Sequence, residues 1–179
     1  VVIANATLHN FEEIEKKDIR EGDKVEIQRA GDVIPQVLKV VKKEKNRKKI
    51  KKPPSFCPVC GSKTMKEKDE AVIRCTNAVT CDAQNLGGLI HFVSKKSLNI
   101  EGLGEKQINQ FYKLGFIKNL EDIFYINKYK NIILDLDGWG ELSFQNLIKS
   151  IEKSKNIALD KFIFSLGIRF VGETLSNLI

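Results

Sequence analysis

The stretch NIEGLGEKQINQF, residues 99–111, places one glycine on each side of Leu103 and follows them with a helix-like run. A dinucleotide-binding loop would need the pattern G-x-G-x-x-G, and position 107 is glutamine. The ending Gly-Lys-Ser/Thr of a P-loop does not occur in the stretch either. The two glycines therefore indicate a turn before a helix, which is either a simple connection or a site for a phosphate group.

The glycine turn is repeated along the chain. Two further stretches, DGWGELSFQNL and GIRFVGETLSNLI, carry the same Gly-Glu step, so that Gly104, Gly140 and Gly172 lie 36 and then 32 residues apart. After the first two of these glycines, apolar residues fall four and seven places on, which is one face of a helix; the third copy fits less well. An apolar run precedes each turn, so the sequence predicts a repeated unit of helix, glycine turn and helix.

Such a unit has the features of a phosphate site. Glycines let the backbone approach another surface closely, and the second helix presents free N–H groups and the positive end of its dipole. The acids Glu105, Glu141 and Glu173 would repel a phosphate unless their side chains point away. A helical bundle with ordinary glycine turns is the alternative, and the repeats alone leave both open. The candidate contacts with a phosphate backbone are Gly102, Gly104, Gly138, Gly140, Gly167 and Gly172.

The composition is that of a soluble protein. The chain has 179 residues, of which 42% are hydrophobic, enough for one or two domains with apolar cores. No run approaches the ~18 apolar residues of a membrane span, and no signal peptide is visible. We expect a cytoplasmic protein without a membrane partner. The start at Val1, without methionine, and an end inside the third repeat suggest a fragment.

The net charge of +7 arises from one block. Residues 39–52, KVVKKEKNRKKIKK, hold nine Lys or Arg against one Glu. A block of this kind is typical of a solvated linker or of a nucleic-acid-binding patch, and taken alone it favours the linker. Pro53 and Pro54 follow it directly and indicate a domain boundary.

All four cysteines lie in one window. Cys57 and Cys60 form a C-x2-C pair, and Cys75 and Cys81 follow after gaps of fourteen and five residues. Two close pairs of thiolates can surround Zn²⁺ tetrahedrally, and four protein ligands make such a site structural rather than catalytic. Two disulfides are the alternative, which a cytosolic chain disfavours. His9 and His91 are then not needed as ligands. His91, within the apolar run LIHFV, is expected to pack in a helix.

The first fifty residues are typical of a β module. In GDKVEIQRAGDVIPQVLKVV, Val25 and Ile27 alternate with polar residues, RAGD favours a turn, and residues 33–41 predict a second strand. Pro35 favours an edge or a bulge in that strand. The preceding stretch ATLHNFEEIEKKD predicts a short helix or a loop. Small barrels of the OB type bind nucleic acid, but fifty residues provide only part of one, and a β module of another purpose is the alternative.

The predicted fold class is multidomain α+β, with three modules in order. They are a partial OB-type β barrel with its basic linker at residues 1–52, a small four-cysteine zinc finger at 53–82, and an all-α helix–hairpin–helix array at 83–179. This order, together with the stretches NATLHN, RAGDVIPQV, CPVCGS, IRCTN, HFVSKKSLNIEGLG and LGIRFVGE, resembles the bacterial NAD-dependent DNA ligases over essentially the whole chain.

The resemblance implies an enzyme that uses NAD⁺ to adenylate a lysine, passes AMP to the 5′-phosphate of a nick, and seals the strand with the help of Mg²⁺, in replication and repair. It implies that the present modules hold nicked double-stranded DNA by its backbone without sequence specificity. The partner would be the adenylation domain of the same chain, in a monomeric, nucleoid-associated protein. The resemblance adds two candidate DNA contacts, Arg29 of RAGDVIPQV and Arg169 of LGIRFVGE.

The chain also departs from the family pattern. The adenylated lysine lies in a K-x-D-G motif, which does not occur in these 179 residues; the nearest stretch, DLDG at 135–138, lacks the lysine. The early strands of the OB domain, a fourth hairpin and the BRCT domain are also missing. We therefore expect no catalytic residue here and no activity of the fragment alone. A non-enzymatic helix–hairpin–helix DNA-binding protein and a repair nuclease remain alternatives; the nuclease would need a carboxylate-rich metal site that the sequence does not suggest.

Overall fold

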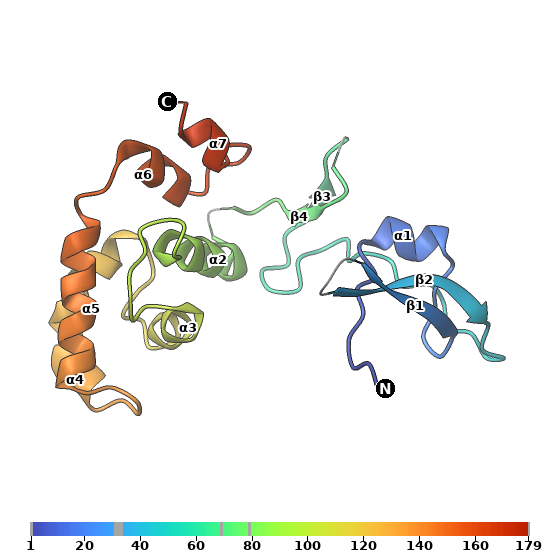
Figure 1. Ribbon diagram of the computed structural model, residues 1–179, viewed down its shortest axis with the longest axis horizontal. Coiled ribbons are helices and arrows are strands. Elements are labelled where there is room, and N and C mark those ends of the chain that lie inside the picture. The colour runs from blue at the N-terminus through green and yellow to red at the C-terminus, as the bar shows by residue number, and fades with distance from the viewer. Residues whose placement is uncertain (1, 31–33, 69, 79, 179) are drawn as a thin grey trace. The chain divides into compact units, whose positions relative to one another are not determined.

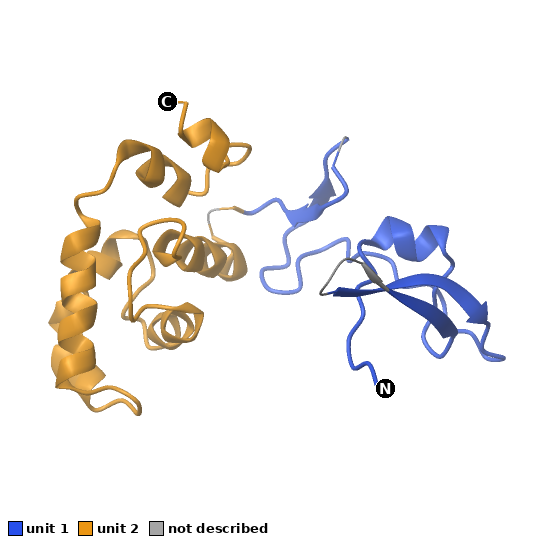
Figure 2. Ribbon diagram, viewed as in Figure 1, with its two compact units in different colours: residues 1–77 blue, residues 78–179 orange. Residues whose placement is uncertain are grey.

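The computed structural model describes residues 2–30, 34–68, 70–78 and 80–178 (Figure 1). Contacts divide the chain into two compact units, Val1–Asn77 and Ala78–Ile179 (Figure 2). The finer division into three domains stays a prediction. Among the described residues, no helix is both long enough and apolar enough to cross a membrane.

The first regular element of the chain is the short helix α1 (Phe11–Lys16), which is the helical one of the two alternatives expected for this stretch. Its N-cap residue Asn10 accepts a hydrogen bond from the Glu13 N–H at 2.8 Å, which satisfies one of the free donors at the helix start. Glu13 also forms an ion pair with Lys17 at 3.1 Å, one helical turn away. No residue of α1 is buried, so its ends rather than an apolar face stabilise this helix.

The two predicted strands form an antiparallel sheet of β1 (Lys24–Ala30) and β2 (Ile34–Lys42). The predicted turn between them falls largely on residues 31–33, which lie outside the described residues. Pro35 lies in β2, and because both strands of a two-stranded sheet are edges, its missing N–H leaves no gap inside a sheet. Val37 is the one buried residue of β2, so this sheet covers little apolar surface.

The basic block at residues 39–52 is tied to the acidic loop that precedes β1. Arg47 has only 15% of its side chain exposed, and its guanidinium forms ion pairs with Asp18 at 2.6 Å and with Asp23 at 2.8 Å. Further ion pairs join Lys43 to Asp18, Lys48 and Lys51 to Glu21, and Lys39 to Glu26. The block is therefore not a freely solvated linker, because carboxylates close to it in the fold neutralise part of its charge.

The first three cysteines lie around a small hairpin in the same unit. Strand β3 (Thr64–Lys66) pairs antiparallel with β4 (Ile73–Cys75), which confirms the strand predicted within AVIRC. Lys66 forms an ion pair with Glu12 of α1 and so connects the hairpin to the N-terminal helix.

Among the described residues of the second unit, the regular elements are all helices (Figure 1). Its elements are α2 (Asp82–Val93), α3 (Glu105–Lys113), the 3-10 helix η1 (Glu121–Tyr129), α4 (Lys130–Leu134), α5 (Glu141–Ser154), α6 (Leu159–Ser165) and α7 (Glu173–Ser176). Each predicted glycine turn lies between two helices, which confirms the repeated unit. The run before the second turn, which has the least regular pattern, is the one that forms a 3-10 helix and a short α-helix.

One apolar core fills the helical unit. The four residues predicted to lie on inner helix faces are all buried: Ile108, Phe111, Phe144 and Leu147. The third copy differs, because Leu175 is 45% exposed and the position equivalent to Ile108 is the buried Ser176. The weaker apolar pattern of the third copy thus corresponds to a buried serine where the first two copies bury an apolar side chain.

His91 is a packed helix residue, as predicted. Its Nε2 lies 2.8 Å from the Phe164 carbonyl oxygen, and the two rings meet edge to face with centroids 4.9 Å apart. His91 therefore joins α2 to α6 and supports the start of the third glycine turn.

Candidate zinc site and nucleic-acid interface

The four cysteines meet in one cluster, in which all the Sγ atoms lie within 4.8 Å of one another. A tetrahedral zinc ion with Zn–S bonds of about 2.3 Å would hold its sulfurs about 3.8 Å apart. The Sγ atoms of Cys60 and Cys75 are 3.4 Å apart, well beyond the ~2.05 Å of a disulfide, and all four cysteines are reduced. The donor set and its size fit one zinc ion.

Three local structures bring the thiols together. Gly61, at φ +70°, closes the first turn so that its N–H donates to the Cys57 carbonyl at 2.9 Å. The β3–β4 pairing sets Cys75 opposite Thr64. Cys81 is fully buried and is the N-cap residue of α2, so the fourth thiol is positioned by the start of a helix.

The turn also favours the charged form of a ligand. Hydrogen bonds from the backbone N–H groups of Cys60 and Val59 lower the pKa of the Cys57 thiol. Because the thiolate is the form that binds metal, these N–H groups prepare the first pair for zinc.

The first glycine of each turn needs the left-handed backbone region. Gly102, Gly138 and Gly167 have φ values of +84°, +81° and +62°. Residues with a side chain rarely adopt this conformation, so the backbone conformation itself favours glycine at these three positions.

The backbone conformation does not favour glycine at the second glycine position of each turn. Gly104, Gly140 and Gly172 are the N-cap residues of α3, α5 and α7, with φ values of −82°, −148° and −85° that any residue adopts. A Cβ added at Gly140 or Gly172 would meet nothing within 4 Å, and at Gly104 only the Gln107 Oε1 at 3.5 Å. Ser, Asn or Asp would cap a helix better than glycine. A positive φ therefore occurs at the first glycine of each turn and not at the second.

Lysines neutralise two of the three glutamates that follow the turns. Lys130 pairs with Glu141 at 2.7 Å, and this contact lowers the pKa of Glu141. Lys96 pairs with Glu173 at 3.0 Å. At these two turns the expected repulsion of a phosphate by the glutamate is reduced.

The structure describes the side chain of only one of the two candidate arginines. Arg29 lies in β1, paired with Pro35, and its side chain is outside the described part of the structure. Arg169 is exposed in the third turn, with its guanidinium carbon 4.7 Å from the centroid of the Phe170 ring. The assignment of all these residues to a DNA interface stays a prediction.

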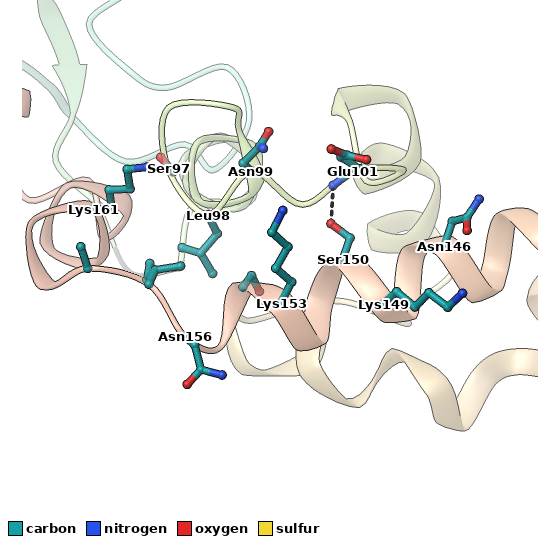
Figure 3. Close-up of a pocket in the computed structure, with 13 residues that line it drawn as sticks. Ser97, Leu98, Asn99, Glu101, Asn146, Lys149, Ser150, Lys153, Asn156 and Lys161 are labelled. Carbon is teal, nitrogen blue, oxygen red and sulfur yellow. Dashed lines mark hydrogen bonds between the residues drawn. The ribbon is translucent and has the colours of Figure 1, made fainter.

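An open groove of about 710 Å³ beside the first glycine turn was missed by sequence reasoning (Figure 3). Lys149 and Lys153 lie along its side on α5, and Lys161 of α6 faces the loop at residues 97–101. The available signal was the four-residue spacing of Lys149 and Lys153 on the polar side of α5, which places both on one helix face.

Two family models match the chain. One, described as the NAD-dependent DNA ligase OB-fold domain, matches residues 1–49, and one described as the NAD-dependent DNA ligase C4 zinc finger domain matches residues 56–83. The predictions of an OB-fold domain and of a four-cysteine zinc finger are thereby confirmed. The assignment of the helical unit to a helix–hairpin–helix array stays a prediction.

Proteins named DNA ligase are similar to the chain over its whole length. The chain is 47% identical over 179 residues to that of Gluconobacter oxydans, 50% identical over 186 residues to that of Afipia carboxidovorans, and 47% identical over 185 residues to that of a Wolbachia from Brugia malayi. Each alignment covers 100% of the chain and 26% of the relative, so the chain spans about a quarter of these curated relatives. The chain belongs to the family of the NAD-dependent DNA ligases, as a portion of such a protein.

Proposed function

We propose that this segment holds nicked duplex DNA by its sugar–phosphate backbone, without sequence specificity, for an NAD-dependent ligase that seals the nick. The helical unit would act as a helix–hairpin–helix array. Membership of the ligase family supports duplex DNA as the partner. The geometry of the glycine turns supports contact with the DNA backbone.

The observation that best supports backbone contact with DNA is the presence of the second glycine in each turn. At Gly140 neither the backbone angle nor the space around it within the chain requires glycine, and a better N-cap residue was possible. A close approach from outside explains the choice, because a side chain would hold a phosphate away from the free N–H groups of the helix start.

Zinc has a structural part in this proposal. Cys57, Cys60, Cys75 and Cys81 would hold one Zn²⁺ with no open coordination position. Bound zinc would fix the turn, the hairpin and the start of α2 to a single point, and no step of the reaction passes through it.

The chemistry of nick sealing would lie elsewhere in the parent enzyme. No K-x-D-G motif occurs in these residues, so NAD⁺ and Mg²⁺ are proposed to act mainly at the adenylation domain. The 179-residue chain should form no adduct with AMP when incubated with NAD⁺ and Mg²⁺. Intact-mass spectrometry tests this, and a covalent AMP adduct would show that the active site is misplaced.

The DNA-holding role is tested by Gly104→Val and Gly140→Val. Both positions have open space and no positive φ, so the fold should persist while affinity for nicked duplex drops at least several-fold on unrelated sequences. The slope of affinity against salt should change little, because backbone amides displace few counterions. Binding is measured across a salt series, with circular dichroism to confirm the fold.

Gly87→Val is the matched control. Gly87 is an exposed glycine of α2 whose surroundings are equally open, and it lies outside every turn. Its variant should bind like the unchanged chain. Turn variants that also stay folded and bind normally would remove the glycine turns from the interface.

A further inference from the structure

Most of the residues that line the groove beside the first glycine turn are polar or charged (Figure 3). The Glu101 N–H donates to the Ser150 Oγ at 2.8 Å, which fixes the loop at residues 97–101 against α5. Asn99 on that loop adopts φ +50°, a region that asparagine tolerates better than most side chains. The groove therefore has a defined wall, and three asparagine amides line it: Asn99, Asn146 and Asn156.

The lysines of the groove are not neutralised. Within the described residues, Lys149, Lys153 and Lys161 form no ion pair, although all three are exposed. Five other lysines of the same unit do have partners: Lys96, Lys130 and Lys155 pair with glutamates, and Lys118 and Lys128 lie over tyrosine rings. Three lysines that form no ion pair among the described residues thus border one groove, where Glu101 is the single lining acid.

This arrangement fits an extended anion better than a single one. Lys149 and Lys153 are one helical turn apart, about 6 Å along the axis, and Lys161 comes from another helix. Like charges at this spacing on a helix repel each other, so the protein alone carries a small cost that a polyanion would remove. The amide side chains that line the same groove can bond to phosphate and sugar oxygens without reading bases.

We propose that this groove binds a stretch of DNA sugar–phosphate backbone that continues past the first glycine turn. The inference rests on the proposed DNA-holding function and adds to it a second contact surface, made by lysine charges rather than by backbone amides. Each lysine would act as a point charge on a phosphate.

The test is the triple variant Lys149→Gln, Lys153→Gln and Lys161→Gln in the 179-residue chain. Duplex affinity should fall equally on unrelated sequences, and the slope of log affinity against log salt should become shallower by about 3, one for each lost phosphate contact. A triple variant of Lys118, Lys128 and Lys155 to Gln, with the same loss of charge, should keep a slope near that of the unchanged chain.

The outcomes separate this inference from the glycine turns. A salt slope that the groove variant does not change, or that the control variant changes equally, would reject the groove as a DNA contact. Gly104→Val and Gly140→Val would still test the glycine turns independently. Loss of binding in the groove variant with normal binding of the glycine variants would keep the groove and reject the turns. Polyglutamate that competes as well as duplex would point to an acidic protein segment and overturn the assignment to DNA.

A direct measurement removes the dependence on variants. Titration of the unchanged chain with duplex should shift the side-chain amide resonances of Asn99, Asn146 and Asn156 in ¹⁵N NMR spectra. Resonances that stay in place at saturating duplex would reject the groove as a contact surface.

Discussion

The two units of the chain are stabilised by different forces. In the unit Val1–Asn77, the buried hydrophobic residues among those described are Ile19, Val37 and Cys57. In the helical unit, a cluster of buried residues from Leu89 to Ile151 forms one continuous core. The first unit instead shows a network of ion pairs around Arg47 and holds three of the four clustered thiols, those of Cys57, Cys60 and Cys75.

The difference teaches how a small β module can hold its shape. A unit of this size buries too little apolar surface to be stable by that means alone, and metals commonly compensate in such domains. The helical unit has no such need, because its first two repeats place their apolar residues on the inner faces of their helices. The two units should therefore fail under different treatments.

Zinc removal should have the largest effect. Structural zinc contributes roughly 10–16 kcal/mol of apparent binding free energy in finger peptides, and that energy is also folding energy. A strong chelator, or Cys75→Ser, should unfold the β3–β4 hairpin. The single methionine, Met65, lies in β3, so its methyl NMR signal reports the hairpin directly.

The comparison also predicts what zinc removal leaves intact. The single tryptophan, Trp139, stacks on Phe111 in the helical core, with ring centroids 5.3 Å apart. Its fluorescence should persist after chelation. Simultaneous loss of the Met65 and Trp139 signals would show that the units do not differ as described, and protein purified without chelator that contains no zinc would reject the metal site.

A cavity made in the helical core should have the second largest effect on stability. Phe144 is 2% exposed, and Phe144→Ala should lower the free energy of unfolding of the helical unit by about 3–5 kcal/mol. Urea unfolding followed by Trp139 fluorescence measures the loss. Leu142→Ala, on the same helix but 72% exposed, is the control and should change little. An equal loss of stability in both variants would contradict the placement of Phe144 in the apolar core.

Acid should affect the first unit through its ion pairs. Hydrogen bonds from Arg47 lower the pKa of Asp23 to about 2 and hold that of Asp18 well below its usual range, and Lys48 and Lys51 lower the pKa of Glu21 to about 2. These carboxylates are more acidic in the folded than in the unfolded chain. Their stabilisation is therefore complete above pH ~4.5 and is lost as the pH falls towards 2.

Arg47→Met should weaken this pH dependence. It removes the main cause of the low pKa values of Asp18 and Asp23, so the unit should be less stable at pH 7 and lose less between pH 4.5 and 2. Methyl NMR signals of Ile19 and Val37 report this unit away from the cysteines. An unchanged pH profile in the variant would assign the acid sensitivity to another group.

The smallest expected effect lies within one glycine turn. Gly138→Ala places a side chain at φ +81° and should cost about 1–2 kcal/mol of helical-unit stability, although no neighbour obstructs the new methyl group. Gly140→Ala keeps an ordinary backbone angle and should change stability by a few tenths of a kcal/mol. Thermal unfolding of the two variants compares them, and equal losses would refute the different roles of the two glycines.

Some of these features could be read from local pattern alone. The cysteine spacing indicated the cluster, because zinc ligands in fingers come from short turns that the sequence contains. The apolar residues four and seven places after Gly104 and Gly140 indicated the buried helix faces, because helical periodicity is local. The repeated glycines indicated the turns for the same reason.

Other features depended on residues far apart in the chain. The lysine-rich block suggested a linker, yet Arg47 meets Asp18 and Asp23 more than twenty positions away. Composition counts charges but does not show which acids lie beside them. The third repeat resembles the others in its glycines, and only the structure shows that Leu175 is exposed while Ser176 is buried.

By itself the sequence determined the cysteine ligand set, the helix–turn–helix repeats and the resemblance to the ligase family, because each depends on residue types at short, fixed spacings. Tertiary structure decided which glycine of each pair has a positive φ, which lysines are neutralised, and that Lys149, Lys153 and Lys161 border one groove. These properties depend on distances between segments that are remote in the chain, and a linear pattern contains no such distances.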